Sequence, residues 1–309
     1  MSRISGASGA HSMDSGDGPE TTARLGPRTW PFVAPSVLVL LSWMIVPLVM
    51  TIWFSLQRYN LMNPLNTGFV GVKNFRNLFA NPSLLPAIWH TVLLVGVVLA
   101  ATIVFGVLLA LLLDMDFYGR SFARVMVIAP FFVMPTVSSL VWKNLLMHPV
   151  NGLFAWITSS LGLGVVDWFT NLPLMAIAII VSWQWIPFAT LILLTAIQSL
   201  DRQQMEAARM DGARGLALLW FIILPHLFRP IAVVVMIESI FLLQIFAEIL
   251  VTTSGGPGDA TTNLTFLIYM KALLQWDIGG ASAGAILAIV LANIVAAFLI
   301  RTVAKNLDK

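Results

Sequence analysis

Six long apolar runs constrain what this chain can fold into more than any other feature of its sequence. The first of them, Phe32–Leu56, holds 25 consecutive residues without a charge. A helix of about 20 apolar residues is long enough to cross the hydrocarbon core of a bilayer, where the backbone must satisfy its own hydrogen bonds. The expected spans lie at about 32–56, 88–113, 125–147, 172–200, 228–252 and 278–301. The sequence therefore predicts an all-α integral membrane protein with six transmembrane helices.

The composition excludes several other classes of protein. Of the 309 residues, 59% are hydrophobic and only 10% charged, which is too apolar for a soluble protein of this size. The first run is longer than the apolar core of a cleavable signal peptide, about 7–15 residues, so it is expected to remain as a span. Residues 1–29 are rich in Ser and Gly and are expected to form a disordered cytoplasmic leader, which leaves 30–309 as the membrane domain. The chain has no cysteine for disulfides or thiolate metal sites, and its net charge of +3 gives no case for nucleic-acid binding.

The distribution of Lys and Arg predicts the orientation. With the N-terminus inside, 12 of the 17 basic residues fall on the cytoplasmic side and 5 fall outside. Cytoplasmic loops of membrane proteins carry an excess of Lys and Arg. Both termini, and the loop between the fourth and fifth runs, are therefore expected to be cytoplasmic.

That loop, residues 201–225, is a short polar segment with an unusual core. Glu206-Ala207-Ala208 is followed by Asp211-Gly212-Ala213 and, at the end, by Leu224-Pro225. The pattern predicts a helix, a turn and a second helix that Pro225 halts. The alanines leave little side chain to keep another surface away, and Gly212 permits a backbone conformation that other residues resist. The segment suits docking into a groove on a partner, although an ordinary solvated loop would also be charged.

The spacing from Glu206 to Pro225 resembles the EAA loop of permease subunits in binding-protein-dependent ABC importers. The whole membrane region is similar to the sugar permeases of type I ABC importers, the group that includes maltose and glycerol-phosphate permeases. Two further segments carry this resemblance: Trp185-Ile186-Pro187-Phe188 in the fourth run and Gly255-Gly256-Pro257 after the fifth. Three others are most similar to sorbitol/mannitol polyol permeases: Ala129–Thr136, Trp142-Lys143-Asn144 and Phe246-Ala247-Glu248.

The resemblance implies a type I importer permease fold, a bacterial inner-membrane location and a set of partners. A second homologous permease would complete the pathway, an ABC ATPase dimer would lie at the cytoplasmic face, and an extracytoplasmic binding protein would deliver a carbohydrate. ATP and Mg would bind the ATPase, because this chain has no G-x-x-x-x-G-K-[ST] motif. No cofactor is expected on this chain, which is expected to be a transport subunit and not an enzyme. The coupling residues would be Glu206, Ala207, Ala208, Asp211, Gly212, Ala213, Leu224 and Pro225.

Candidates for the substrate pathway follow from what sugars need, which is a few well-placed polar groups together with aromatic faces. The runs offer Asn144, Trp183, Gln184, Trp185, Gln244, Phe246 and Glu248. Each has a structural alternative, since a membrane Trp often packs or anchors at the interface and a Gln often hydrogen-bonds between helices. Glu238 lies deeper in its run with no obvious basic partner. Such an intramembrane acid indicates function by default, but it can also hold helices together.

Three functional classes follow from these features. An ABC permease for a polyol, another sugar, a glycoside or glycerol phosphate accounts for the polar loop. An ion-coupled secondary transporter would favour inverted repeats with broken helices; the sequence shows no persuasive repeat, although Pro187 could break the fourth span. A membrane enzyme would need a catalytic or metal-binding cluster, yet the four histidines are scattered without ligand spacing, so no metal site is expected.

Overall fold

The computed structural model describes residues 30–213 and 215–307, so the expected leader, 1–29, lies outside the described residues. The chain divides into two compact units at Leu48/Val49. Helix α1 (Trp30–Ser55) supplies all that is described of the first unit. Its apolar residues are spread over every face, as expected for a helix surrounded by lipid.

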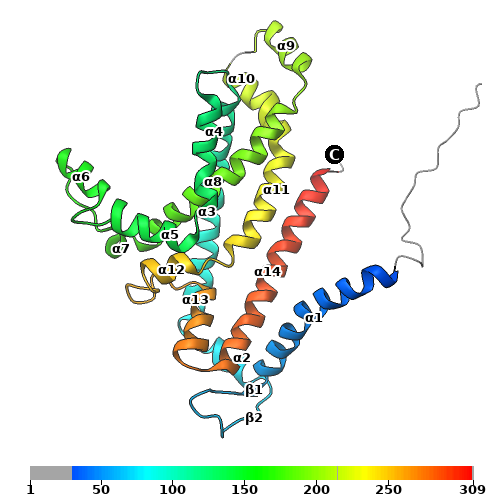
Figure 1. Ribbon diagram of the computed structural model, residues 1–309, viewed down its shortest axis with the longest axis vertical. Coiled ribbons are helices and arrows are strands. Elements are labelled where there is room, and N and C mark those ends of the chain that lie inside the picture. The colour runs from blue at the N-terminus through cyan, green and yellow to red at the C-terminus, as the bar shows by residue number, and fades with distance from the viewer. Residues whose placement is uncertain (1–29, 214, 308–309) are drawn as a thin grey trace, which may run out of the picture. The chain divides into compact units, whose positions relative to one another are not determined.

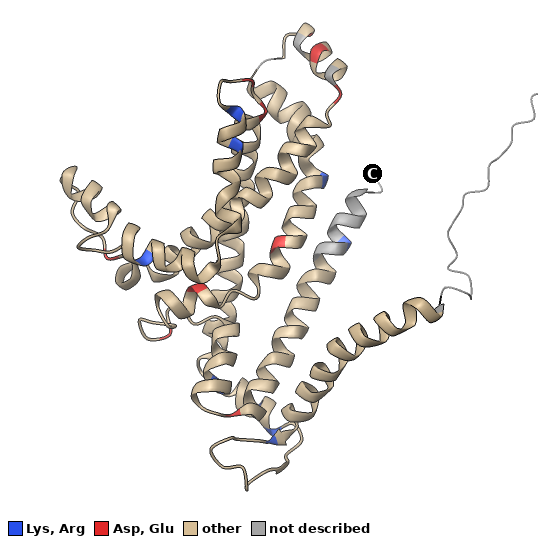
Figure 2. Cartoon of the chain, in the orientation of Figure 1, with Lys and Arg blue, Asp and Glu red and all other residues tan. Residues whose placement is uncertain are grey.

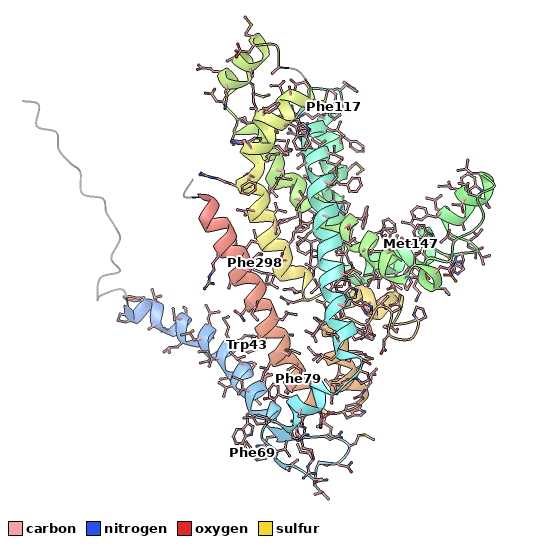
Figure 3. All side chains as sticks on the ribbon, turned by 180° about the vertical axis from the view of Figure 1, so that it is seen from behind. Trp43, Phe69, Phe79, Phe117, Met147 and Phe298 are labelled. Carbon is pink, nitrogen blue, oxygen red and sulfur yellow. The ribbon has the colours of Figure 1, made fainter. Side chains whose placement is uncertain are left out.

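The second unit is a helical bundle built on the pair α3 (Leu84–Asp114) and α8 (Pro173–Gln198) (Figure 1). The two helices approach closely because Gly106 of α3 faces Ala189 of α8. A Cβ atom at Gly106 would lie 2.8 Å from the Cβ of Ala189. Small residues at such contacts let helix backbones pack tightly where lipid removes the hydrophobic drive for association. Helix α11 (Leu224–Leu242) packs against both members of this pair (Figure 3).

The remaining elements connect and cover this bundle. The helices are α2 (Lys73–Phe79), α4 (Arg120–Ile128), η1 (Ala129–Phe132), α5 (Pro135–Val141), η2 (Trp142–Leu146), α6 (Leu153–Ser160), α7 (Trp168–Asn171), α9 (Arg202–Met210), α10 (Leu216–Leu218), η3 (Leu219–Ile223), α12 (Ala247–Thr252), α13 (Leu264–Tyr269), η4 (Met270–Leu274) and α14 (Ile278–Leu307). Two antiparallel strands, β1 (Gln57–Arg58) and β2 (Gly68–Phe69), pair Gln57 with Phe69. Within the described ranges, five helices are long and apolar enough to span a membrane, and a bent pair supplies a sixth. Charged side chains are sparse along these helices (Figure 2).

The third run, expected as one span over 125–147, instead forms two helical pieces bent by 105°. The break lies at Val133 and Met134, directly before Pro135. A residue that precedes proline is pushed out of the helical region, and Met134 accordingly has φ −60° and ψ 136°. The first piece runs along α8, whereas α5 leads away from the bundle axis (Figure 1).

The fifth run also differs from the expected span over 228–252. Its helix begins earlier, at Leu216, and continues to Leu242, so Pro225 does not halt it. The expectation was wrong because Pro225 falls in the first turn of α11, directly after the π-helical segment η3. Proline lacks the N–H that would close one helical hydrogen bond, and the π-helical turn before it lets the helix continue. At the other end, residues 243–246 break the helix before α12.

Candidate functional site

A cavity of about 370 Å³ opens where these two helix breaks lie near each other. Five of the seven expected pathway residues line it, and they come from three separate elements. The lining comprises Phe131, Pro135, Gln184, Trp185, Phe241, Gln244, Ile245, Phe246, Ala247 and Glu248. Irregular backbone is tolerated at membrane depth where protein buries it or where it lines a cavity. The breaks therefore give the chain a polar site that straight helices would not offer.

Side-chain donors form hydrogen bonds with the backbone carbonyls at both breaks. The Nε2 of Gln184 donates to the carbonyl of Val133 at 2.6 Å, and the Nδ2 of Asn263 donates to the carbonyl of Ile245 at 2.6 Å. Thr265 donates from its hydroxyl to the carbonyl of Leu243 at 3.2 Å. Each bond satisfies a backbone acceptor that the interrupted helix leaves without its usual partner. Gln184 thus has a structural role at the edge of the cavity as well as a place in its lining.

The aromatic part of the lining belongs to two sets of contacting rings. The indole of Trp185 lies 5.9 Å from the ring of Phe131 and 5.3 Å from that of Phe241, measured between centroids. In a second set, the ring of Phe246 lies 4.9 Å from that of Tyr269. All three separations fall in the range of favourable aromatic pairs. These contacts hold the rings in place while leaving them in the lining of the cavity.

Glu248 is the ionisable residue of the lining. It is buried and lies in the first turn of α12, where helical N–H groups lack intrahelical acceptors. At the other end of the same helix, the Nζ of Lys143 donates to the carbonyl of Val251 at 3.1 Å. The helix that presents Glu248 is therefore anchored to η2, the segment that follows the first break.

Two expected pathway residues lie outside the cavity. Trp183 packs edge-on against Trp142, with 5.7 Å between ring centroids, in a separate core cluster. Asn144 lies exposed on η2. Sequence reasoning had not named Phe131, Pro135 and Phe241 as pathway residues. Phe241 precedes Gln244 by one helical turn, so helical periodicity was the signal that pointed to it.

Glu238 is fully buried but does not line this cavity. Its Oε2 lies 2.6 Å from the hydroxyl of Thr102 on α3, and that hydroxyl is also 3.1 Å from the carbonyl of Leu99. Its Oε1 is buried without a hydrogen-bond partner. In the described part of the chain, the ion pairs found are those of Arg120, and none involves Glu238. The geometry therefore places Glu238 as a link between α3 and α11.

The polar segment after α8 folds as a helix and a tight turn. Glu206 and Ala207 are exposed on α9, and Ala208 and Ala213 are half-buried. The N–H of Ala213 donates to the carbonyl of Ala208 at 2.9 Å, while Gly212 has φ +87°. This is the geometry of a Schellman cap, in which a residue with positive φ ends the helix and glycine is preferred. Asp211 is exposed, Leu224 is half-buried and Pro225 is exposed, so most of the segment faces outward.

Comparison with known proteins identifies the chain. Residues 82–309 match the family described as "Binding-protein-dependent transport system inner membrane component". The chain belongs to this family. It is a permease subunit of an ABC importer and a multi-pass inner-membrane protein. The predictions of family, location and a transport role without enzymatic activity are confirmed.

The relatives align with most of this chain. It is 34% identical over 263 residues to a trehalose/maltose transport system permease protein of Thermococcus litoralis, covering 84% of this chain and 88% of the relative. It is 25% identical to an sn-glycerol-3-phosphate transport system permease protein of Agrobacterium fabrum, covering 89% and 94%. The solved structure of a bacterial ABC transporter that imports alginate superposes with a TM-score of 0.75 at 24% identity, covering 90% of this chain and 96% of that one. This last likeness confirms the predicted permease fold.

Proposed function

We propose that this permease carries an uncharged carbohydrate, with polyols such as sorbitol and mannitol as the first candidates. The observation that carries the proposal is the cavity at the two helix breaks. Its rings from Trp185 and Phe246 can lie against C–H faces, and its amides and the carboxyl group of Glu248 can bond to hydroxyl groups. The trehalose/maltose permease among the relatives supports the sugar class.

The charge of the lining argues against an anionic substrate in this subunit. Glu248 is acidic, and neither Lys nor Arg is among the residues that line the cavity. A phosphate or carboxylate held there would need a cationic or N–H partner to offset its desolvation. The lining therefore favours a neutral polyol or sugar over glycerol phosphate.

The coupling scheme rests on the segment after α8. In the proposal, an ATPase dimer that binds ATP and Mg receives the exposed face of α9, with Glu206 in polar docking, Ala207 and Ala208 at the closest approach and Gly212 in the turn. A second homologous permease completes the pathway, and an extracytoplasmic binding protein supplies the substrate. Both termini and this segment lie in the cytoplasm, as the excess of Lys and Arg there favours. A ligand such as ATP that prefers one of two states shifts the whole assembly toward it.

The test is uptake of radiolabelled sorbitol, mannitol, maltose and glycerol 3-phosphate, in cells that lack the chain and in cells given it back. We expect restored uptake of an uncharged substrate that depends on ATP. Gln244→Ala, inside the cavity, should reduce that uptake, whereas Asn144→Ala, an exposed residue outside it, should not. Restoration of glycerol 3-phosphate uptake alone would refute the proposed substrate class. Uptake that survives ATP depletion would refute the coupling scheme.

A further inference from the structure

A continuous face of α8 and α11 extends from the cavity toward the polar segment. On α8 this face carries Trp185, Phe188, Ile192, Ala196 and Ser199, spaced three or four residues apart as one helical stripe requires. On α11 the matching stripe is Pro230, Val233, Ile237 and Phe241, and Gln244 follows in the break directly after this helix. The two helices pack against each other. Trp185 and Ser199 are 14 residues apart, which is about 21 Å along a helix.

Two adjoining cavities occupy the far end of this face. One, of about 470 Å³, is lined by residues that include Ile192, Thr195 and Val233. The other, of about 820 Å³, adds His226 and Trp220, and the two share Ala196, Ser199, Arg229 and Pro230. The Nε2 of His226 lies 3.0 Å from the carbonyl of Ala196 and 3.3 Å from the hydroxyl of Ser199. The far end of the stripe is therefore hollow, and the larger of its two cavities includes the polar residues Ser199, His226 and Arg229 in its lining.

Between the hollow ends, four rings form a contact cluster. Phe188 stacks on Phe131 with 5.8 Å between centroids and lies edge-on to Trp185 at 5.8 Å. Trp185 in turn contacts Phe131 at 5.9 Å and Phe241 at 5.3 Å. The cluster thus joins η1, α8 and α11, and three of its four rings line the first cavity. Phe188 lines neither that cavity nor the next one, and along α8 it lies between Trp185, which lines the first, and Ile192, which lines the second.

We propose that this four-ring cluster of Phe131, Trp185, Phe188 and Phe241 closes the transport pathway between two water-accessible halves of the α8/α11 groove. This inference rests on the proposed function for the direction of transport, but the barrier itself can be tested without any substrate. Close-packed rings leave no path for water or a polar solute, and truncation of one ring opens such a path only because polar, water-accessible cavities adjoin the cluster on both sides. The cavities around Ser199 and Arg229 then form the exit half of the pathway.

Site-directed labelling tests the barrier, because the chain contains no cysteine of its own. Gln244→Cys reports on the first cavity and Ser199→Cys on the far one. Each variant is placed in the complete transporter in intact cells, and a membrane-impermeant maleimide is added on the side that labels Gln244→Cys. We expect Ser199→Cys to stay unlabelled from that side. Adding Phe188→Ala should raise its labelling to the rate seen for Gln244→Cys.

Control variants distinguish loss of the ring barrier from a general effect of substitution or failed insertion. Phe122→Ala, at an exposed phenylalanine of α4, should leave Ser199→Cys protected. If Phe188→Ala fails to insert, Phe188→Leu or Phe131→Ala tests the same contact with a smaller change. Labelling of Ser199→Cys with all four rings present, or protection that persists when Phe188 or Phe131 is truncated, would overturn the proposal. Failure of the proposed function would instead appear as absent carbohydrate uptake with the labelling pattern intact.

Discussion

Replacement of Gly212 by aspartate separates coupling from folding more cleanly than any other single change in this chain. Gly212 has φ +87°, and a Cβ atom placed there would meet no atom of the described residues within 4 Å. The cost to folding is therefore backbone strain alone, about 1–2 kcal/mol for an ordinary residue in the left-handed region and less for Asn or Asp. Against a typical stability of about 5–15 kcal/mol, the variant should still fold and insert.

The free-energy cost to association with the proposed ATPase should be larger than the cost to folding. Since none of the described residues lies within 4 Å of a Cβ atom at Gly212, the carboxylate of Gly212→Asp would project outward, into the groove of the ATPase in the proposed coupling scheme. A buried carboxylate without a partner costs several kcal/mol; a loss of about 3 kcal/mol would weaken ATPase association about a hundredfold. Gly212→Asn has almost the same shape and tolerates the same backbone, so it isolates the charge. We expect uptake to be abolished in Gly212→Asp and only reduced in Gly212→Asn.

Three measurements on each variant decide the matter. They are substrate uptake, the amount of ATPase that co-purifies, and the abundance of the chain in the membrane with its partner permease. Normal uptake by Gly212→Asp would refute the assignment of this turn to coupling. Loss of the chain from the membrane would show that the strain argument is wrong. Equal effects of Asn and Asp would mean that bulk, and not charge, excludes the side chain.

Further predictions concern the cavity and the bundle. Asn263→Ala leaves the carbonyl of Ile245 without its side-chain donor, which should lower the free energy of unfolding by about 1–3 kcal/mol. The thermal midpoint in detergent should fall accordingly, whereas Asn144→Ala, at an exposed site, should leave it unchanged. Gly106→Leu should disrupt the α3–α8 contact and reduce the amount of folded chain, because even a methyl group there would meet Ala189 at 2.8 Å. Gly96→Leu on the same helix is the matched control, since a Cβ atom there meets nothing within 4 Å among the described residues. Glu248→Gln should keep uptake of a neutral polyol within about tenfold, since an amide still offers hydrogen bonds, whereas Glu248→Leu should abolish it; equal uptake by the two variants would remove Glu248 from the site.

The long apolar runs predicted the helices well because their length and lack of charge admit no other stable structure in lipid. The second, fourth and sixth expected spans correspond to α3, α8 and α14 with small shifts at their ends. The breaks at 133–134 and 243–246 were not predicted, because a break depends on which side chain satisfies the freed carbonyl. Those partners, Gln184 and Asn263, are 51 and 18 residues away in sequence. Composition proposed Gln184, Trp185, Gln244, Phe246 and Glu248 as candidates, but only the fold could gather them and leave Trp183 and Asn144 outside.

The last prediction concerns the protonation of Glu238, whose hydrogen bond with Thr102 links α11 to α3. The hydroxyl of Thr102 has one proton, and it lies within reach of two acceptors, the carbonyl of Leu99 and Oε2 of Glu238. Both contacts are satisfied together if Glu238 is a neutral acid that donates to Thr102, which in turn donates to Leu99. A charge at this depth in a membrane helix would also be costly without a partner.

A double-mutant cycle tests this arrangement. Glu238→Gln should preserve stability and uptake, because the amide can donate to Thr102 in place of the acid proton. Thr102→Val should cost about 1–3 kcal/mol, since it leaves the buried carboxyl group unpaired. Thr102→Val combined with Glu238→Met should be more stable than Thr102→Val alone, because neither partner is then left unsatisfied. If Glu238→Gln is inactive while its abundance is normal, transport requires the carboxyl group itself, and the hydrogen-bonded link to Thr102 does not account for the role of Glu238.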